Sequence, residues 1–165
     1  MGTEIERKFL VKGDEWRTTS ARCYWQGYLN QDSERSARVR LIEDGAGARG
    51  FMTVKGISRG AARVEFEYAI PPEDARQMLE GLCLQPLIGK ERHKVEYDGF
   101  LWEIDEFFGE NAGLIMAEVE LTDENQEVPM PPWIGAEVTG KPRYFNANLG
   151  SYPYSQWSDD ERAGG

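Results

Sequence analysis

Cysteine and histidine are both scarce. The 165 residues contain only Cys23, Cys83 and the single histidine His93, and the two cysteines stand far apart, outside any Cys-x-x-Cys spacing. This pattern predicts neither a disulfide framework nor a zinc site, and it fits a reducing compartment. We interpret His93 as structural or exposed, because it has the parity opposite to Arg92 in the strand expected there.

Long apolar runs are also absent. No segment reaches membrane-spanning length, and the charged opening of the sequence lacks the hydrophobic middle of a signal peptide. We therefore expect a cytoplasmic protein with no membrane partner.

Basic residues are outnumbered by acidic ones. The chain has 19 Lys and Arg against 29 Asp and Glu, a net charge of -10, which argues against nucleic acid as a partner. The positions of the bases are more informative than their number, since many of them stand two residues apart in segments that alternate with period two.

Turn signals, rather than long helical patterns, separate these segments, which favours a β-rich domain. A 165-residue chain with 40% hydrophobic content is long enough for one core. We expect a single domain over residues 1–150 and a polar, mobile tail over 151–165. The expected strands include 3–11, 37–42, 51–56 and 63–69, further strands around 90–94, 102–107 and 117–121, and one helix over 71–84.

The charged faces of these strands are grouped by sign. Like charges at positions i and i+2 repel, so a fold tolerates them repeatedly only if counter-charges or a bound ligand offset them. A sandwich with its charged face in water is the alternative. The acidic pairs are Glu4 with Glu6, Glu65 with Glu67, Glu103 with Asp105, and Glu118 with Glu120, and the bases are Lys8, Arg38, Arg40, Lys55, Lys90, Arg92 and Lys94.

Carboxylates beside clustered Lys and Arg suit a polyanion bound together with a hard cation such as magnesium or manganese. Closing the strands into a barrel would turn the charged faces inward and would leave no exposed sheet edge.

The opening Glu4-Ile5-Glu6-Arg7-Lys8 matches the Glu-x-Glu-x-Lys signature of the CYTH family, the triphosphate tunnel metalloenzymes. The sequence resembles this family over about residues 3–149, and most closely its bacterial inorganic triphosphatases. Further matches follow in the family's order, at Arg38 and Arg40, Lys55, Glu65 and Glu67, Lys90 and Arg92, Asp105, Glu118 and Glu120, and from Trp133 through Glu137-Val-Thr-Gly to Tyr144 and Asn146.

The resemblance implies a β-rich α+β fold: a closed eight-stranded antiparallel β-barrel, open at both ends, with a few peripheral helices and two-metal chemistry at an acidic wall. By resemblance, the ligands of magnesium or manganese would be Glu4, Glu6, Asp105, Glu118 and Glu120. The phosphates would be held by Lys8, Arg38, Arg40, Lys55 and Arg92, with Lys90 and Lys94 as further candidates and with Lys141 or Arg143 closing one end.

Two details stay open at this point. Glu65 and Glu67 either orient the bases or take part in metal binding. Lys8 and Tyr28 are the catalytic candidates: the Tyr28 phenol could reach Lys8 to position water or a leaving oxygen, and the alternative is a tyrosine packed in its strand.

The resemblance predicts an enzyme, a metal-dependent hydrolase that converts inorganic triphosphate to pyrophosphate and phosphate. A nucleoside or thiamine triphosphatase, or a class IV adenylate cyclase, would share the same charged residues, although no base-binding pocket is identifiable in the sequence. A polyphosphate- or nucleotide-binding module without turnover is the non-enzymatic alternative. The expected partner is a small-molecule triphosphate, and a homodimer is possible because the outer apolar faces exceed what one short helix can cover.

Overall fold

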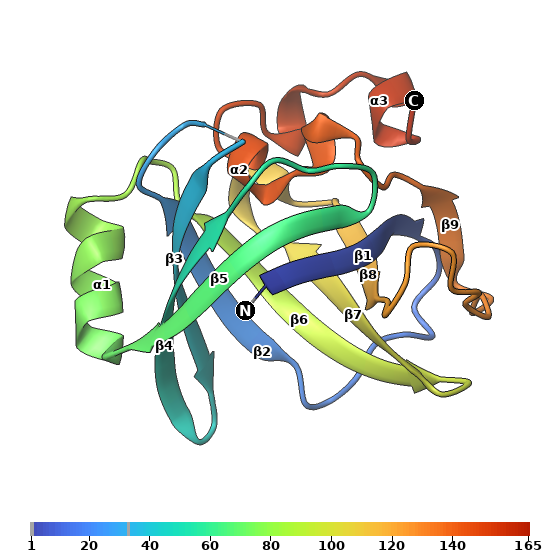
Figure 1. Ribbon diagram of the computed structural model, residues 1–165, viewed down its shortest axis with the longest axis horizontal. Coiled ribbons are helices and arrows are strands. Elements are labelled where there is room, and N and C mark those ends of the chain that lie inside the picture. The colour runs from blue at the N-terminus through green and yellow to red at the C-terminus, as the bar shows by residue number, and fades with distance from the viewer. Residues whose placement is uncertain (1, 33) are drawn as a thin grey trace.

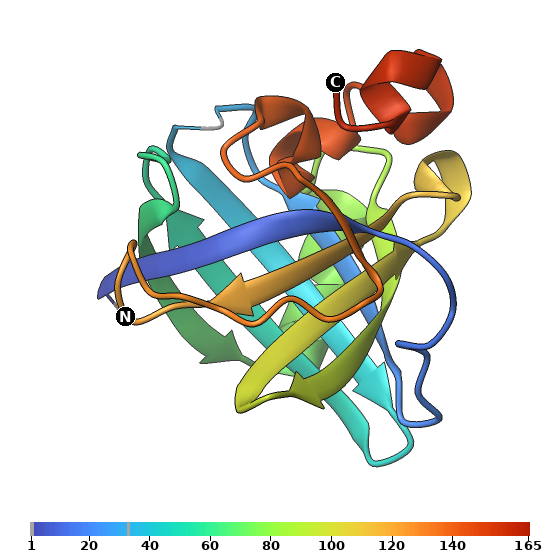
Figure 2. The same ribbon diagram turned by 90° about the vertical axis from the view of Figure 1, so that its right-hand side faces the viewer.

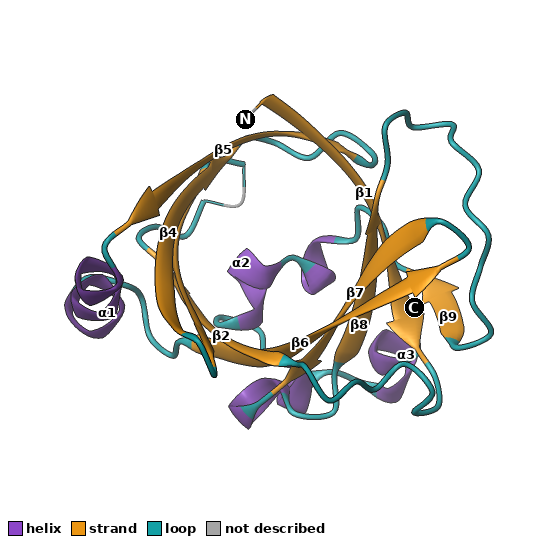
Figure 3. Cartoon of the chain, turned by 90° about the horizontal axis from the view of Figure 1, so that it is seen from below, coloured by secondary structure: helices purple, strands orange, loops and turns teal. Residues whose placement is uncertain are grey.

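The computed structural model describes residues 2–32 and 34–165, and within them nine strands form one antiparallel sheet. The strand order is β5-β4-β3-β2-β6-β7-β8-β1-β9, and β5 also pairs with β1, which closes eight strands into a barrel (Figures 1 and 3). The expected eight-stranded antiparallel barrel is confirmed. The strands are β1 (Gly2–Val11), β2 (Arg22–Tyr28), β3 (Ser36–Asp44), β4 (Gly47–Lys55), β5 (Ala62–Ile70), β6 (Ile88–Tyr97), β7 (Phe100–Phe107), β8 (Ile115–Glu120) and β9 (Ile134–Glu137).

Strand β1 is the seam of the barrel. One of its edges pairs with β8 from Glu6 to Leu10. The opposite edge pairs first with β5, from Gly2 to Ile5, and further along with β9 at Phe9. Residue Lys8 therefore lies where the partner of this edge changes from β5 to β9.

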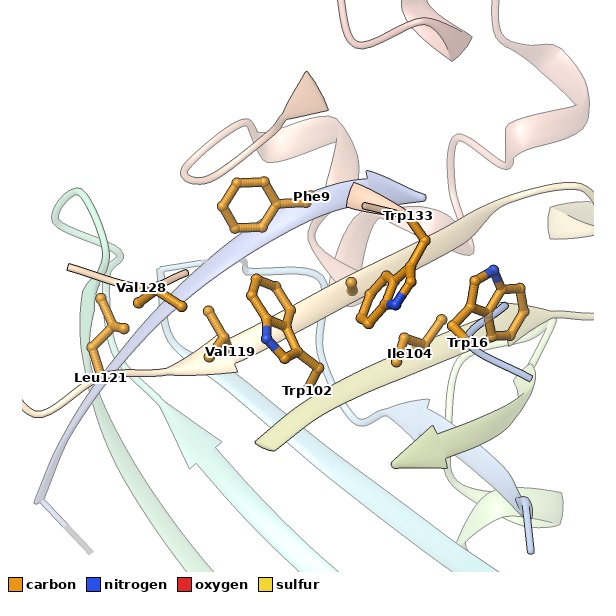
Figure 4. Close-up of a cluster of buried hydrophobic side chains, with 9 residues drawn as sticks. Phe9, Trp16, Trp102, Ile104, Val119, Leu121, Val128 and Trp133 are labelled. Carbon is orange, nitrogen blue, oxygen red and sulfur yellow. The ribbon is translucent and has the colours of Figure 1, made fainter. Parts of the chain in front are cut away.

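Alternate residues of a strand point to opposite sides of the sheet. Because the charged residues take the inner side of this barrel, its outer face is apolar. Figure 4 shows the largest outer cluster, which joins β1, β7 and β8 to the loop after β1 and to the segment before β9. Trp16, Trp102 and Trp133 belong to it, and the rings of Trp102 and Trp133 meet edge to face with centroids 5.7 Å apart.

The helix α1 (Pro72–Gly81) covers β3 and β4 on another side of the wall. Ala75 and Leu79 pack against Val39 and Leu41 there. The helix ends three residues before the expected residue 84, and Leu82, which the pattern assigned to its apolar face, is 69% exposed.

One end of the bore is filled, contrary to the expectation of a barrel open at both ends. Tyr28, Ile88, Phe107 and Met116 point inward at this end and pack against residues of the C-terminal segment, among them Trp157. Helix α2 lies across the bore in Figure 3, and the C-terminal segment lies over the same end in Figures 1 and 2. The short helices of this region are η1 (Gly109–Asn111), η2 (Pro142–Tyr144), α2 (Asn146–Leu149), η3 (Tyr154–Gln156) and α3 (Asp159–Arg162).

The residues after 150 thus contribute to the core. Trp157 is only 5% exposed, and its ring meets that of Tyr144 edge to face at 5.0 Å. The side chain of Ser158 caps α3 by accepting from the Glu161 amide, in a capping box. The division of the chain at residue 150 and the mobility of the tail in solution stay predictions.

We expect Trp157→Ala to lower the free energy of unfolding by about 3 kcal/mol, because it removes a buried indole from the filled end. Urea unfolding measures this, with Leu82→Ala as the exposed control that should change stability by less than about 0.5 kcal/mol. A change below about 1 kcal/mol for Trp157→Ala would mean that the tail does not pack in solution.

Candidate active site

The barrel encloses a cavity of about 530 Å³ whose wall is built from the inward-facing residues of eight strands and from Asn146 and Ala147 of α2. Its charged lining is mixed in sign, and several of its acidic and basic side chains form ion pairs with one another. The acidic lining residues are Glu4, Glu6, Glu65, Glu67, Glu103, Glu118 and Glu120, and the basic ones are Lys8, Arg22, Arg38, Arg40, Arg49, Lys55, Arg63, Arg92 and Lys94.

Four carboxylates gather on two neighbouring strands. Glu6 of β1 pairs in register with Glu120 of β8, and Glu118 stands two residues before Glu120. Glu4 lies on the same face of β1 and also lines the cavity. Carboxylate oxygens are the ligands that magnesium and manganese prefer, so the chemistry of this donor set fits a hard divalent cation. Among the described residues, no three of these carboxylates bring oxygens within 4.8 Å of one another, so they would move closer together around an ion.

The opposite wall is basic, and one of its bases lacks a partner. Among the described residues, no carboxylate lies within ion-pair distance of Arg40, whose guanidinium stacks on the Tyr24 ring at 5.1 Å. Burial, together with the neighbouring charges of Arg38 and Arg92, lowers the pKa of Arg40 to about 9. A bound anion would relieve both effects.

Two further bases of this wall are held by glutamates of β5. The Lys55 ammonium donates to Glu4 at 3.2 Å and lies 3.4 Å from Glu65. Glu67 accepts from the Thr53 hydroxyl at 2.9 Å and lies 3.8 Å from Arg38. These contacts favour the interpretation that Glu65 and Glu67 orient the bases.

Lys8 projects between the carboxylates, with its Nζ 3.8 Å from both Glu6 and Glu118. Burial alone would lower the pKa of Lys8, but the charges of Glu118 and Glu6 outweigh burial and raise it. The side chain therefore remains an ammonium that can stabilise negative charge. Tyr28 also lines the cavity, although no hydrogen bond joins these two described residues.

Asp105 forms a buried hub inside the bore, between the cavity and the filled end. It accepts two hydrogen bonds from Arg92, at 2.7 and 2.8 Å, and the Lys90 ammonium lies 2.7 Å from its second oxygen. Burial would raise the pKa of Asp105, but Arg92 and Lys90 hold it well below its usual range. Burial also lowers the pKa of Lys90 to about 7, against the opposing pull of Asp105.

Comparison with known proteins agrees with this geometry. The sequence profile of the CYTH domain matches residues 2–149. The chain belongs to the CYTH family. A protein of Acetivibrio thermocellus named inorganic triphosphatase is 49% identical over 160 residues, which span 96% of this chain and 100% of that protein. An inorganic triphosphatase of Nitrosomonas europaea is 36% identical over 154 residues, which span 89% of this chain and 96% of that protein.

Solved structures show the same CYTH architecture. The crystal structure of an inorganic triphosphatase superposes with a TM-score of 0.64 at 35% identity, covering 91% of this chain and 95% of that one. A proposed adenylate cyclase from Bacillus halodurans superposes with a TM-score of 0.56 at 15% identity, covering 79% and 96% of the two chains, and it shares the fold alone.

The cavity of the barrel brings together most of the residues expected from the sequence. Lys94 lies on its wall, 3.8 Å from Glu103. Asp105 and Lys90 have inward parity but do not line the cavity, because they are buried between it and the filled end, and both Asp105 oxygens already have partners. A metal-ligand role for Asp105 and a phosphate contact for Lys90 remain predictions that the geometry does not favour.

Lys141 and Arg143 face the C-terminal segment rather than the CYTH cavity. Lys141 donates to the Gly164 carbonyl, and Arg143 donates to Glu161 at 3.1 Å and to the Gly165 carbonyl. The proposed closure over substrate stays untested. The sequence offered no sign of these contacts, because they depend on the fold of the tail.

Three lining bases were missed by the sequence analysis: Arg22, Arg49 and Arg63. A signal existed for Arg63, which shares its parity with Glu65 and Glu67, and for Arg49, which shares its parity with Lys55. Arg22 has the parity of Tyr28, but the extent of β2 was not assigned.

A second acidic group lies outside the CYTH cavity. It consists of Glu91, His93 and Glu106. Each offers one possible metal-ligand atom, and these three atoms lie within 4.8 Å of one another. The Thr18 amide donates to His93 Nδ1 at 3.0 Å, so the proton of the neutral ring is on Nε2 and leaves no lone pair there for a metal. We interpret His93 as structural, in agreement with its burial.

A second, small pocket of about 20 Å³ shares Glu4, Glu6 and Lys8 with the cavity and is bounded on its other side by the loops around Gly60 and Gly140. This volume is close to that of a single water site.

We expect Asp105→Asn to lower the free energy of unfolding by about 3 kcal/mol, because it leaves the buried Lys90 without a counter-charge and leaves Arg92 only the Glu103 carboxylate, 3.4 Å away. Urea unfolding in the presence of a chelator measures this without any metal contribution. The matched control is Glu120→Gln, an exposed carboxylate of the cavity, which should change stability by less than about 0.5 kcal/mol. Unchanged stability together with weaker metal binding in Asp105→Asn would instead establish Asp105 as a ligand.

Proposed function

We propose that this protein hydrolyses inorganic triphosphate to pyrophosphate and phosphate inside the barrel, with a divalent metal ion. The observation that carries the proposal is the unpartnered Arg40 guanidinium on a basic wall that faces four glutamates across one cavity. Two relatives named inorganic triphosphatase, at 49% and 36% identity over nearly the whole chain, support the same reaction.

The metal requirement of CYTH triphosphatases agrees with the acidic wall. Magnesium or manganese would be held by Glu4, Glu6, Glu118 and Glu120. When bound, the ion neutralises phosphate charge and lowers the pKa of a coordinated water.

The chain's own bases complete the reaction. Arg38, Arg40 and Lys55 bind the non-bridging phosphate oxygens and fix the substrate in the cavity. Arg92, held in its orientation by Asp105, binds them from β6. Water attacks the terminal phosphorus and releases its proton to solvent, and the bond to the bridging oxygen breaks, so that pyrophosphate leaves with the bonding electron pair. The Lys8 ammonium stabilises the negative charge that develops between the carboxylates.

Other triphosphates would use the same groups. A nucleoside or thiamine triphosphatase would place its organic group toward the open end of the bore, and a class IV cyclase would additionally need to hold a ribose. The non-enzymatic alternative binds polyphosphate or nucleotide with metal and shows no turnover.

We expect phosphate release from tripolyphosphate to exceed release from ATP, thiamine triphosphate and pyrophosphate, and to need magnesium or manganese. Glu6→Gln should lower turnover by roughly 100-fold or more, because it removes a carboxylate ligand. Chelator should abolish turnover, and Leu82→Ala should leave it unchanged. Metal-dependent binding without turnover on any substrate would move the assignment to a binding module, and preference for ATP or thiamine triphosphate would move it to the corresponding enzyme.

Tyr28→Phe tests the second catalytic candidate. If the phenol positions water or a leaving oxygen near Lys8, removing its hydroxyl should lower kcat by roughly 10-fold while KM changes little. Steady-state kinetics on tripolyphosphate measure this. Unchanged turnover would leave Tyr28 as a packing residue of the filled end.

Apart from the small-molecule substrate, the expectations about partners (no nucleic acid, no membrane, a possible homodimer) and about a cytoplasmic location remain predictions. No helix among the described residues is long and apolar enough to cross a membrane. The homodimer prediction gains a candidate surface, because Val64, Phe66 and Tyr68 of β5 and Val54 of β4 are exposed on the outer wall. This neutral face is one on which two copies of an acidic chain could meet without repulsion.

A further inference from the structure

The backbone of Lys8 is bonded by a segment far away in the sequence. On this edge of β1, the last bond toward β5 runs from the Glu6 amide to the Ala61 carbonyl, at 3.0 Å. Pairing with β9 begins at Phe9. Between them, the Lys8 amide donates to Thr139 Oγ1 at 2.9 Å, and the Val138 amide donates to the Lys8 carbonyl at 2.8 Å.

The direction of the Thr139 hydroxyl proton decides whether this bond can form. The hydroxyl has one proton and two lone pairs. Its oxygen lies 2.6 Å from Glu137 Oε2 but 3.4 Å from the Lys8 carbonyl, so the proton goes to the glutamate. A lone pair is then free to accept from the Lys8 amide.

Arg7 fixes the glutamate from the outer face of the barrel. Its Nε and Nη2 donate to the two oxygens of Glu137 at 2.9 and 2.8 Å, a bidentate pair that sets the plane of the carboxylate. The hydrogen bond from Arg7 also lowers the pKa of Glu137, which keeps this group an ionised acceptor.

The same segment reaches the Lys8 side chain. Beyond Gly140 it leads to Phe145, whose ring centroid lies 5.6 Å from Lys8 Nζ, and then to Asn146 on the cavity wall. Residues 137–146 therefore contact Lys8 both at its backbone and at its ammonium.

We propose that Thr139, oriented by Glu137 and Arg7, is a positioning residue that holds the Lys8 ammonium in place between the carboxylates of the cavity. The proposal rests on the proposed function for its kinetic consequence, but not for its structural one. Thr139 does not touch substrate, and it acts through the backbone of β1.

The first test is kinetic. Thr139→Val keeps the shape of the side chain and removes the hydroxyl, so we expect kcat on tripolyphosphate to fall by roughly 10-fold to 100-fold while KM changes by less than about threefold. Thr139→Ser restores the hydroxyl and should keep kcat within about threefold of wild type. Thr122→Val removes an exposed hydroxyl that bonds only locally to Gln126, and it should change neither constant.

The second test does not need turnover. Amide hydrogen exchange followed by NMR, without substrate or metal, should show the Lys8 amide exchanging at least roughly 10-fold faster in Thr139→Val, while the Glu6 amide is unchanged. If Thr139→Val does not fold, Glu137→Gln replaces it, and we expect changes in the same direction because the ionic pair with Arg7 is lost.

The outcomes separate the two proposals. Wild-type protein without turnover on any triphosphate overturns the proposed function, and the exchange measurement still decides whether Thr139 holds Lys8. Faster Lys8 exchange with an unchanged kcat overturns the positioning role, as does a kcat loss that Thr139→Ser fails to rescue. An unchanged Lys8 exchange rate in Thr139→Val overturns the bond itself.

Discussion

Charge that points inward is the constraint on which the rest of this structure depends. Burying a charge is costly unless an opposite charge or a hydrogen bond compensates it. The barrel compensates most of its inward bases internally, through Asp105 for Arg92 and Lys90, and through Glu4 and Glu65 for Lys55. Among the described residues, Arg40 and Glu120 have no ion-pair partner, and Lys8 alone faces both Glu6 and Glu118, so the same electrostatics that fold the barrel also favour a metal-bound polyanion as ligand.

The apolar residues that stabilise the fold and the charged residues that carry the chemistry lie on opposite faces of the same sheet. The apolar residues that would fill the interior of an ordinary barrel here lie outside it, under α1 and under the segments around Trp16 and Trp133. This arrangement lets the bore stay polar while the wall remains rigid. It also explains why the outer contacts of Arg7 and Glu137 matter for an inner residue, since a strand that is fixed from outside presents its inward side chains in fixed positions.

Period-two alternation predicted seven of the nine strands and the charged face of each, because parity decides which side chains share a face. The resemblance to the CYTH family supplied the closure into a barrel and the roles of the lining residues. Parity says nothing about partners on other strands, so Asp105 had the same signal as Glu103 although only Asp105 is enclosed by Arg92 and Lys90. The filled end had a sequence signal that was not used: Ile88 and Met116 occupy inward positions but are apolar. The folding of the C-terminal segment depends on Trp157 finding that cluster, a long-range contact that local pattern does not encode.

A bore with one filled end has a single mouth, which fixes the order in which large molecules enter and leave. The triphosphate and the pyrophosphate that it yields must pass through the same mouth, and so the next substrate cannot enter until the larger product has left. The small pocket next to Glu4, Glu6 and Lys8 has room for about one water molecule, so the larger reactants have only the mouth of the bore as their route.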